Sequence, residues 1–320
     1  MNKKKKILFI TAGLLVLAGC IVFICVMSKV GWNFKKLSTV EYVTNTHEIR
    51  ESFDDVSIIT DTADITFVLS DEGNCGVTCY EEKNAKHSVA VENNALVIKI
   101  DDNRELHDYV GFRFDTPKIT VLLPKNNFNS LFVKGSTGNV EASDDFAFGS
   151  AEISLSTGNA DFCAAVSGTV KIKTSTGNIG IKNTSVGSLD LSVTTGKVTV
   201  VAVTCGEDAR INVSTGKATL TDVTCRNLIS DGSTGNITLS RVVAEKKLSV
   251  ERSTDNVKFV GCDAAEIYVK TSTGDVKGNL LSDKVFVTDT STGDVDVPAS
   301  AGGGRCEIRT STGDIEIKIG

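Results

Sequence analysis

Apolar and polar side chains alternate with a period of two through most of the chain after residue 46, as they do in β-strands with one buried face. The pattern is organised around a short phrase that keeps returning, for example STGNI at 175–179, STGDV at 291–295 and STGDI at 311–315. The third position of this phrase recurs every 19 or 20 residues, at Gly138, Gly158, Gly177, Gly196, Gly216, Gly235, Asp255, Gly274, Gly293 and Gly313. A fixed period of this length is typical of a solenoid.

Apolar residues keep constant offsets from these glycines. In the repeat around Gly196, Leu191 lies five residues before it, and Val198 and Val200 lie two and four residues after it. Offsets that differ by two place side chains on the same face of a strand. Each repeat therefore predicts a strand, an STG corner, a second strand and a looser return of about ten residues.

Two architectures can use this unit. A hairpin meander would need roughly twenty strands in one sheet, whereas open twisted sheets rarely exceed ~10 strands. In a β-solenoid, each strand pairs in parallel with its equivalent in the next coil, ~4.8 Å away, so equivalent residues become neighbours. We therefore predict an all-β fold, a parallel β-solenoid of about ten 19–20-residue coils over residues 131–320. Glycine supplies the positive φ of a tight corner, and Asp255, the one exception, is a residue type tolerated there.

The region before the repeats is also strand-like but less regular. Residues 63–69 (ADITFVL) and 95–100 (ALVIKI) alternate or run apolar between turn signals. We predict that residues 46–130 form an N-terminal β capping region, which would cover the unpaired backbone of the first coil. Residues 28–45 are predicted to be a juxtamembrane linker.

The N-terminus predicts a membrane anchor. Ile7–Met27 is an uncharged run between Lys3–Lys6 and Lys29, and 21 helical residues at 1.5 Å each span about 30 Å, the thickness of a bilayer's hydrocarbon core. We predict a transmembrane signal-anchor helix over 7–27, a cytoplasmic basic tail over 1–6 and an extracytoplasmic C-terminal region. The alternative is a lipoprotein, because LAGC at 17–20 resembles a lipidation box with Cys20 as the modified residue. The apolar run continues seven residues beyond Cys20, which favours the anchor.

Charge divides the chain into two parts. Residues 1–36 hold seven lysines and no acid, so the remainder carries 27 basic and 40 acidic groups, a net charge of −13. Nucleic-acid binding relies on basic side chains that neutralise phosphates, so this surface argues against nucleic-acid partners. It is compatible with solubility alone, with cations or with cationic peptides.

Two longer stretches suggest a family. They are FDDVSIITDTADITFVLSDEG at 53–73 and DTPKITVLLPKNNFNSLFVKGSTGNVEA at 115–142, followed by the STG[ND] phrases. Together they resemble the bacterial putative-adhesin family of β-strand-repeat proteins, a domain family of unknown function. The resemblance implies a surface-exposed β-solenoid with an adhesive or envelope-related role, and it brings no catalytic residues with it.

The residue after each corner glycine forms a column that ends in three acids, Asp275, Asp294 and Asp314. Stacked ~4.8 Å apart in water, each neighbouring pair of carboxylates costs only ~1 kcal/mol. The column is therefore predicted to be a tolerated solvated surface. The alternative is a Ca²⁺ column, although the dedicated Ca²⁺ repeat GGxGxDxUx is absent.

The cysteines predict one structural contact. Cys205 and Cys225 share an offset of nine from their corners, so we expect them to stack on adjacent coils, within reach of a disulfide. Buried free thiols fit a narrow interior as well and are favoured. Cys75 and Cys79 would need further ligands to bind a metal, and none is evident in the sequence. His47, His87 and His107 lie outside the repeats and are expected at the surface.

The sequence contains no evident catalytic residues, no cofactor-binding motif and no evident set of metal ligands. A polysaccharide-active enzyme is disfavoured because basic residues are scattered and the only tryptophan, Trp32, lies beside the anchor. We predict a membrane-anchored extracytoplasmic scaffold with an adhesin-like role, binding an envelope protein, a wall polymer or a cationic peptide. The alternative is an envelope-stress sensing or regulatory component acting through a membrane partner. The final coil (DIEIKIG) shows no cap, which predicts a monomer with weak end-to-end self-association that Lys318 would discourage.

Overall fold

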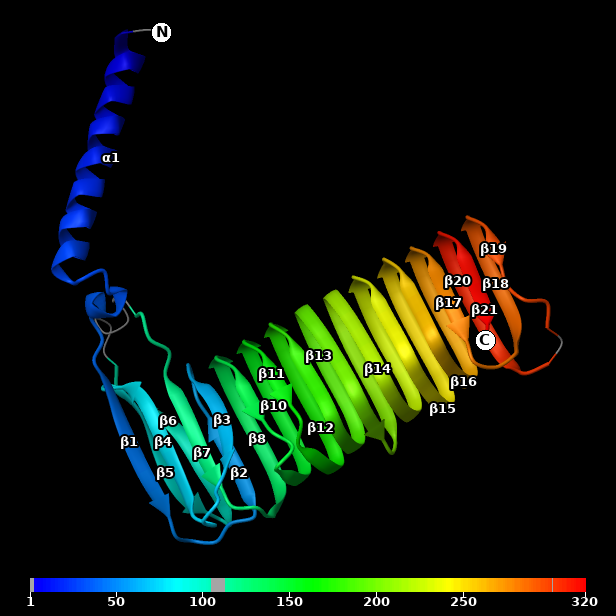
Figure 1. The fold of residues 1–320 in the computed structure, drawn as a ribbon, viewed down its shortest axis with the longest axis horizontal. Helices are drawn as coiled ribbons and strands as arrows, with labels where there is room; N and C mark the ends of the chain where they lie inside the picture. Colours follow the sequence, from blue (N-terminus) through cyan, green and yellow to red (C-terminus); the bar gives the residue numbers. More distant parts are fainter. Residues whose placement is uncertain (1–2, 105–112, 301) are drawn as a thin grey trace.

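A computed structural model describes residues 3–104, 113–300 and 302–320 of the chain. It shows a long rod of stacked strands with one helix at its N-terminal end (Figure 1). The strands pair in parallel with their equivalents one repeat away, so the predicted all-β parallel solenoid preceded by an apolar helix is confirmed. The meander is excluded for the repeats, because the only antiparallel pairs among the described residues lie near the N-terminal end.

The helical elements are α1 (Lys3–Lys29) and η1 (Phe34–Leu37). The strands up to the start of the regular repeats are β1 (Tyr42–Ile49), β2 (Asp55–Ile59), β3 (Asp64–Leu69), β4 (Cys75–Glu82), β5 (Ala85–Glu92), β6 (Ala95–Asp102) and β7 (Lys118–Leu123). The repeats contain β8 (Asn127–Thr137), β9 (Val140–Ala142), β10 (Ala147–Thr157), β11 (Ala160–Phe162), β12 (Ala165–Thr176), β13 (Ile179–Cys205), β14 (Asp208–Thr234), β15 (Ile237–Thr254) and β16 (Val257–Thr273). The C-terminal strands are β17 (Val276–Leu280), β18 (Lys284–Thr292), β19 (Val295–Asp296), β20 (Gly304–Thr312) and β21 (Ile315–Ile319).

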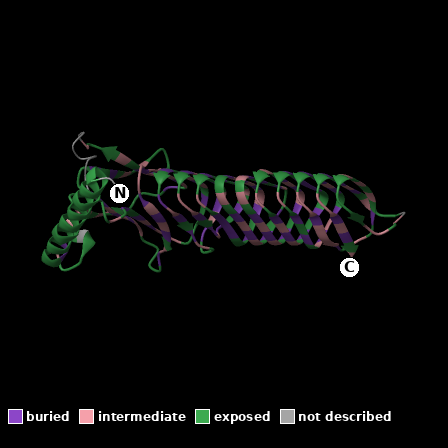
Figure 2. Cartoon of the chain, turned by 90° about the horizontal axis from the view of Figure 1, so that it is seen from above, coloured by how far each residue is buried: buried purple, intermediate pink, exposed green. Residues whose placement is uncertain are grey.

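Buried residues run along the length of the rod (Figure 2), and their apolar side chains form one continuous core. One interior row shows how the coils fit together, because its members become smaller along the chain: Phe128, Phe148, Val166, Val186, Cys205, Cys225, Ala244 and Ala264. Within this row the rings of Phe128 and Phe148 lie 5.7 Å apart. Large side chains therefore fill the N-terminal coils, and small ones fill the C-terminal coils on this side.

The N-terminal end does not follow the order of the sequence. β2 lies between β6 and β8, and β3 pairs with both β7 and β9, so the first coil of the chain is the second coil of the stack. The predicted boundary at residue 131 therefore moves, because parallel coils already form within 55–123. Beyond β6 and β7, the antiparallel strands β5, β4 and β1 cover the end, and we call these three strands the N-terminal cap.

The C-terminal end shows the same exchange, which corrects the expectation that DIEIKIG forms the outermost coil. β20 pairs with β16 on one side and β18 on the other, and β21 likewise lies between β17 and β19 (Figure 1). The last residues of the chain are thus interior, and 284–296 form the distal coil. The three corner phrases here are nearly identical, so local pairing permits either order. Both ends of the solenoid chain are held between neighbouring coils.

The N-terminal helix is longer than predicted, Lys3–Lys29 instead of 7–27, because the flanking lysines continue the helical turns. It is the one described helix long and apolar enough to cross a membrane. Its most apolar stretch of 18 residues has a mean hydropathy of 2.9, and none of that stretch is buried in the protein. Its side chains, including that of Cys20, are almost all exposed (Figure 2). Such a helix fits a membrane span or a signal peptide.

Candidate functional site

The corner positions stack directly on one another. The corner glycines all have positive φ, and a methyl group added at most of them would overlap a carbonyl oxygen of the preceding corner. Asp255 adopts φ +84°, and its carboxylate accepts a hydrogen bond from the amide of Gly235 (2.8 Å). The phrase therefore recurs because nearly every coil needs a corner with positive φ and no side chain at that place, with Asp255 as the exception.

The residue after each corner glycine has a structural role that the sequence reading missed. Asn139 Oδ1 accepts from the backbone amide of Asn159 (3.0 Å), and Asn159 Oδ1 accepts from that of Asn178 (2.9 Å). The side-chain amide of each next asparagine also donates to the same oxygen. Asparagine and aspartate share this acceptor oxygen, which explains eight of the ten residues at this position; Lys197 and Lys217 are the exceptions. We call this row the corner ladder.

The three acids continue the corner ladder in the exchanged order. Asp275 Oδ1 accepts from the amide of Asp314 (3.0 Å), and Asp314 Oδ1 accepts from the amide of Asp294 (3.2 Å). Lys277 Nζ lies 3.0 Å from Asp275 and 3.1 Å from Asp314. The hydrogen bond from the Asp294 amide and the Lys277 ammonium both hold the pKa of Asp314 below its usual value. These oxygens thus already have partners, which weighs against the Ca²⁺ alternative.

Cys205 and Cys225 lie one coil apart in the same interior row, and both are buried free thiols. Burial raises the pKa of Cys225 to about 12 and also raises that of Cys205. A thiol in this state is a poor nucleophile. The geometry assigns them to packing.

One side of the rod has a hollow lined by residues of five successive coils. The hollow holds about 700 Å³ and is lined by Asn127, Phe128, Asn129, Ala147, Phe148, Gly149, Ala165, Val166, Ser167, Ser185, Val186, Gly187 and Gly206. Apolar side chains such as Phe148 and Val166 alternate in its lining with small residues, and at Gly149 an added methyl would lie 2.6 Å from the Asn129 carbonyl oxygen. We call this surface the side hollow. It is long, open and uncharged, and it crosses the coils in the direction of the rod.

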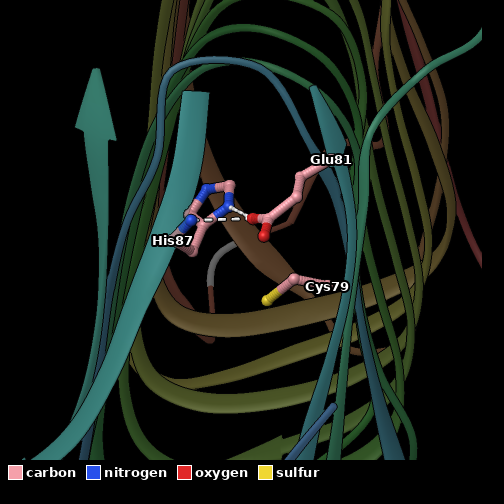
Figure 3. A group of neighbouring side chains, drawn as sticks. All are labelled: Cys79, Glu81 and His87. Carbon is pink, nitrogen blue, oxygen red and sulfur yellow. Dashed lines mark hydrogen bonds and ion pairs between the residues drawn. The ribbon is translucent and has the colours of Figure 1, made fainter. Parts of the chain in front are cut away.

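A second candidate lies inside the N-terminal cap (Figure 3). Cys79 and Glu81 point from β4, and His87 points from β5; these side chains are exposed by 5 % or less. His87 Nδ1 is 2.7 Å from Glu81 Oε2, which also accepts from the His87 backbone amide. Asn45 Nδ2 donates to Glu81 Oε1 (2.6 Å), and Thr60 Oγ1 is 2.9 Å from His87 Nε2. We call Cys79, Glu81 and His87 the cap cluster.

The hairpin between β4 and β5 creates this cluster. β4 extends one sheet by pairing with β7, while β5 extends the other by pairing with β6. The two strands share only the pair Glu82–Ala85, so they separate at once and face each other across the interior. Residues two apart on β4, such as Cys79 and Glu81, point to that same interior.

The line Thr60, His87 and Glu81 resembles the hydroxyl, imidazole and carboxylate of a hydrolase. Its surroundings argue against that chemistry, because the cavity beside His87 holds only about 10 Å³, roughly one water. Burial, with the charge of Glu81, raises the pKa of Cys79 to about 12, so that thiol is not a nucleophile at neutral pH either. The cluster therefore has the chemistry of a structural or metal-binding site.

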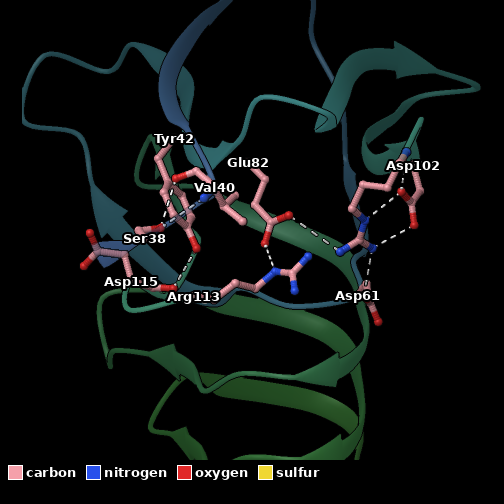
Figure 4. A network of polar contacts seen from close by, with 9 residues as sticks. Ser38, Val40, Tyr42, Asp61, Glu82, Asp102, Arg113 and Asp115 are labelled. Atoms are coloured by element: carbon pink, nitrogen blue, oxygen red, sulfur yellow. Dashed lines mark hydrogen bonds and ion pairs between the residues drawn. The ribbon is translucent and has the colours of Figure 1, made fainter. Parts of the chain in front are cut away.

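An ion-pair network lies next to the cap cluster (Figure 4). Arg104 Nη2 donates to Asp102 (2.7 Å) and lies 3.2 Å from Asp61 near the first corner. Arg113 Nε donates to the buried carboxylate of Glu82 (2.8 Å). These pairs join the hairpin of the cap to the first coils, which makes the cap part of the stack.

The histidines correct one expectation. His87 is buried, and Nε2 of His47 is also buried, because β1, β4 and β5 fold over the end of the rod. His107 lies outside the described residues. Sequence reasoning missed the cap cluster, since its members come from strands without a repeat. The one available signal was alternation within CYE at 79–81, which places Cys79 and Glu81 on one face.

The family model that matches this chain is Toastrack DUF4097, over residues 53–217 and 207–320. The chain belongs to the Toastrack family. This agrees with the resemblance to β-strand-repeat adhesins seen in the sequence. None of the curated proteins matches.

The chain is also similar to solved structures that are distant from it in sequence. A putative adhesin from Bacteroides fragilis is 16% identical, with 87% of this chain and 97% of that chain covered and a TM-score of 0.42. A putative adhesin from Parabacteroides distasonis is 9% identical over 85% and 98%, with a TM-score of 0.45. A putative lipid binding protein from the same species is 19% identical over 86% and 97%, with a TM-score of 0.46.

Proposed function

We propose that this Toastrack protein is a membrane-anchored extracytoplasmic scaffold that binds an extended chain, a peptide segment or wall polymer, along the side of its rod. The observation that carries the proposal is the side hollow of about 700 Å³, whose lining comes from five successive coils. A volume of this size is in the range of ligand sites, roughly 300–1,000 Å³. Its open, elongated shape suits an extended partner better than a compact small molecule.

Three further features support a binding role. The apolar helix α1 is exposed over nearly its whole length and would hold the rod at a membrane. The stacked core gives the surface a fixed geometry with little to reorganise on binding. The buried cysteines and the closed cavity beside His87 offer no reactive group to a substrate.

The polar lining determines what the hollow would accept. Asn127, Asn129, Ser167 and Ser185 are exposed at its rim and provide hydrogen-bond donors and acceptors without charge. Such a lining suits the amides of a peptide or the hydroxyls and amides of a wall polymer. The acidic surface outside the hollow would favour partners with positive charge through long-range attraction.

The test is binding of the full-length protein in detergent to cell-wall fractions and to cationic peptides. Ser167→Trp places a large ring in the hollow and is expected to abolish binding, while Ser233→Trp, an exposed serine at a corner, leaves it intact. Equal binding by both variants would remove the hollow from the proposal. If only a membrane sensor protein co-purifies, with no wall polymer or peptide bound, the regulatory role replaces the adhesive one.

A further inference from the structure

We propose that the cap cluster, Cys79, Glu81 and His87, is a zinc site that fastens the N-terminal cap to the stack. The Sγ, carboxylate oxygen and imidazole nitrogen of these residues all lie within 4.8 Å of one another. Zinc bonds of ~2.0–2.3 Å place tetrahedral ligands roughly 3.3–3.8 Å apart. The three donors therefore need only small movements to surround one ion. This inference is independent of the side hollow.

The donor types match zinc. Thiolate and imidazole suit Zn²⁺, and one carboxylate oxygen is a common third ligand. Cys79 as thiolate and Glu81 as carboxylate supply two negative charges, which neutralise Zn²⁺ within a fully buried site. Burying such a set is favourable only when the charges balance in this way. Hard cations such as Ca²⁺ and Mg²⁺, which prefer six or more oxygens or octahedral water, find only one carboxylate here.

The existing hydrogen bonds orient the ligands. In the metal-free arrangement, the contact between His87 Nδ1 and Glu81 Oε2 (2.7 Å) holds both donors towards one point. When Nδ1 of His87 binds zinc, Nε2 carries the ring proton and donates a hydrogen bond to Thr60 Oγ1, 2.9 Å away. Metal-binding histidines almost always have such a partner on their second nitrogen. Zinc displaces the thiol proton of Cys79, which is released to solvent.

A second, independent observation is an unexplained nitrogen next to the cluster. Nε2 of His47 is buried and has no hydrogen-bond partner, whereas nearly all buried polar atoms have one. His47 is in register with Val77, and Asn45 with Cys79, so His47 is a diagonal neighbour of Cys79 on the same face. Long side chains at diagonal positions reach one another. The ring nitrogens of His47 are not among the atoms that lie within 4.8 Å of one another, so its side chain would have to rotate towards Cys79 to act as the fourth ligand, and we assign it that role.

The site would join parts of the fold that have few other connections. It takes ligands from β1, β4 and β5 and, through Thr60, reaches the first coil. The three strands of the cap are the only described strands without a parallel partner, so they gain least from the stacked core. A metal here would act as a staple at the end of the rod.

The experiment uses full-length protein in detergent, stripped with a chelator and titrated with Zn²⁺ against a chromophoric zinc indicator. The expected result is one zinc per chain and a higher melting temperature with zinc than without it. Cys79→Ser is expected to weaken binding at least a hundredfold, and His47→Ala at least tenfold. Cys225→Ser, another buried free thiol, serves as the control and should bind zinc like the wild type.

Cobalt gives a readout that a merely structural role would not produce. Co²⁺ bound through Cys79 produces a thiolate-to-metal absorption band that is present in the Cys225→Ser variant and absent in Cys79→Ser. If the wild-type protein binds no zinc, the proposed site is wrong. It is also wrong if Cys79→Ser binds zinc with the affinity of the wild type. Unchanged affinity in His47→Ala overturns the fourth ligand. Should Cys79→Ser fail to fold, Glu81→Gln, which keeps the shape and removes one charge, replaces it with the same expected loss.

Discussion

A methyl group at a corner should damage the fold far more than the same methyl at another glycine. At Gly216, φ is +137°, a conformation that L-residues rarely adopt, and a Cβ there would overlap the carbonyl oxygen of Gly196 in the preceding coil. Backbone strain of this kind costs roughly 1–3 kcal/mol. Relief of the overlap requires two hydrogen-bonded coils to separate. We therefore expect Gly216→Ala to lose more than about 4 kcal/mol, among the largest single-residue effects.

Two other glycines separate the strain from the overlap. Gly73 has φ +75° with nothing within 4 Å of an added methyl, so Gly73→Ala is expected to cost only about 1–2 kcal/mol of left-handed strain. Gly206 is not left-handed, and the nearest atom to an added methyl is 3.7 Å away. Gly206→Ala is therefore expected to be neutral or to stabilise by about 0.4–1 kcal/mol, because alanine restricts the unfolded chain.

The assay is thermal unfolding of full-length protein in detergent, followed by far-ultraviolet circular dichroism. At about 2–4 °C per kcal/mol for a chain of this size, Gly216→Ala should melt more than about 8 °C lower than the wild type. Gly73→Ala should lie between it and Gly206→Ala. A Gly216→Ala protein that melts together with Gly73→Ala would refute the reasoning, because the corner would then have no coil stacked against it.

Three further predictions follow from the corner ladder and the cysteines. Asn159→Ala removes an acceptor shared by two donors and should cost about 1–2 kcal/mol in thermal unfolding, whereas Lys197→Ala, in the same row, should cost almost nothing; equal losses would contradict the ladder. The lowered pKa of Asp314 adds stability at neutral pH that is lost on acidification below about pH 4. The difference in melting temperature between the wild type and Lys277→Met should therefore shrink below about pH 4. A difference that stays constant with pH would contradict the ion pair's contribution. Cys205 and Cys225 should react with iodoacetamide only after denaturation, as measured by mass spectrometry, because burial raises both pKa values; rapid labelling of the native protein would show that the row is open.

The period of the corner phrase was enough to predict the solenoid, because stacking makes each coil repeat the same steric demand. The spacing of Cys205 and Cys225 placed them in one interior row for the same reason. The position after each glycine was read as a surface, although its side-chain oxygens bind the next coil's amides. That role was not visible in a single repeat, since the acceptor and the donor belong to different coils.

The order of coils at the ends could not be predicted from the pattern. The phrases at Gly274, Gly293 and Gly313 are nearly interchangeable, so each can stack on any other and the pattern alone does not determine their order. The cap cluster could not be predicted from the sequence for the opposite reason. Cys79, Glu81 and His87 have no repeated partners, and a hairpin that divides between two sheets brings them together.

The most direct measurement is a disulfide that can form only between stacked neighbours. Lys270 and Arg309 are exposed Cα partners on β16 and β20, so the double variant Lys270→Cys/Arg309→Cys should cross-link, since parallel neighbours ~4.8 Å apart lie within disulfide range. Asp289 lies one rung beyond Arg309, roughly twice that distance from Lys270, so Lys270→Cys/Asp289→Cys should stay reduced. Cross-linking of the second pair instead of the first would contradict the exchanged order, and cross-linking of neither would contradict the stacked rod.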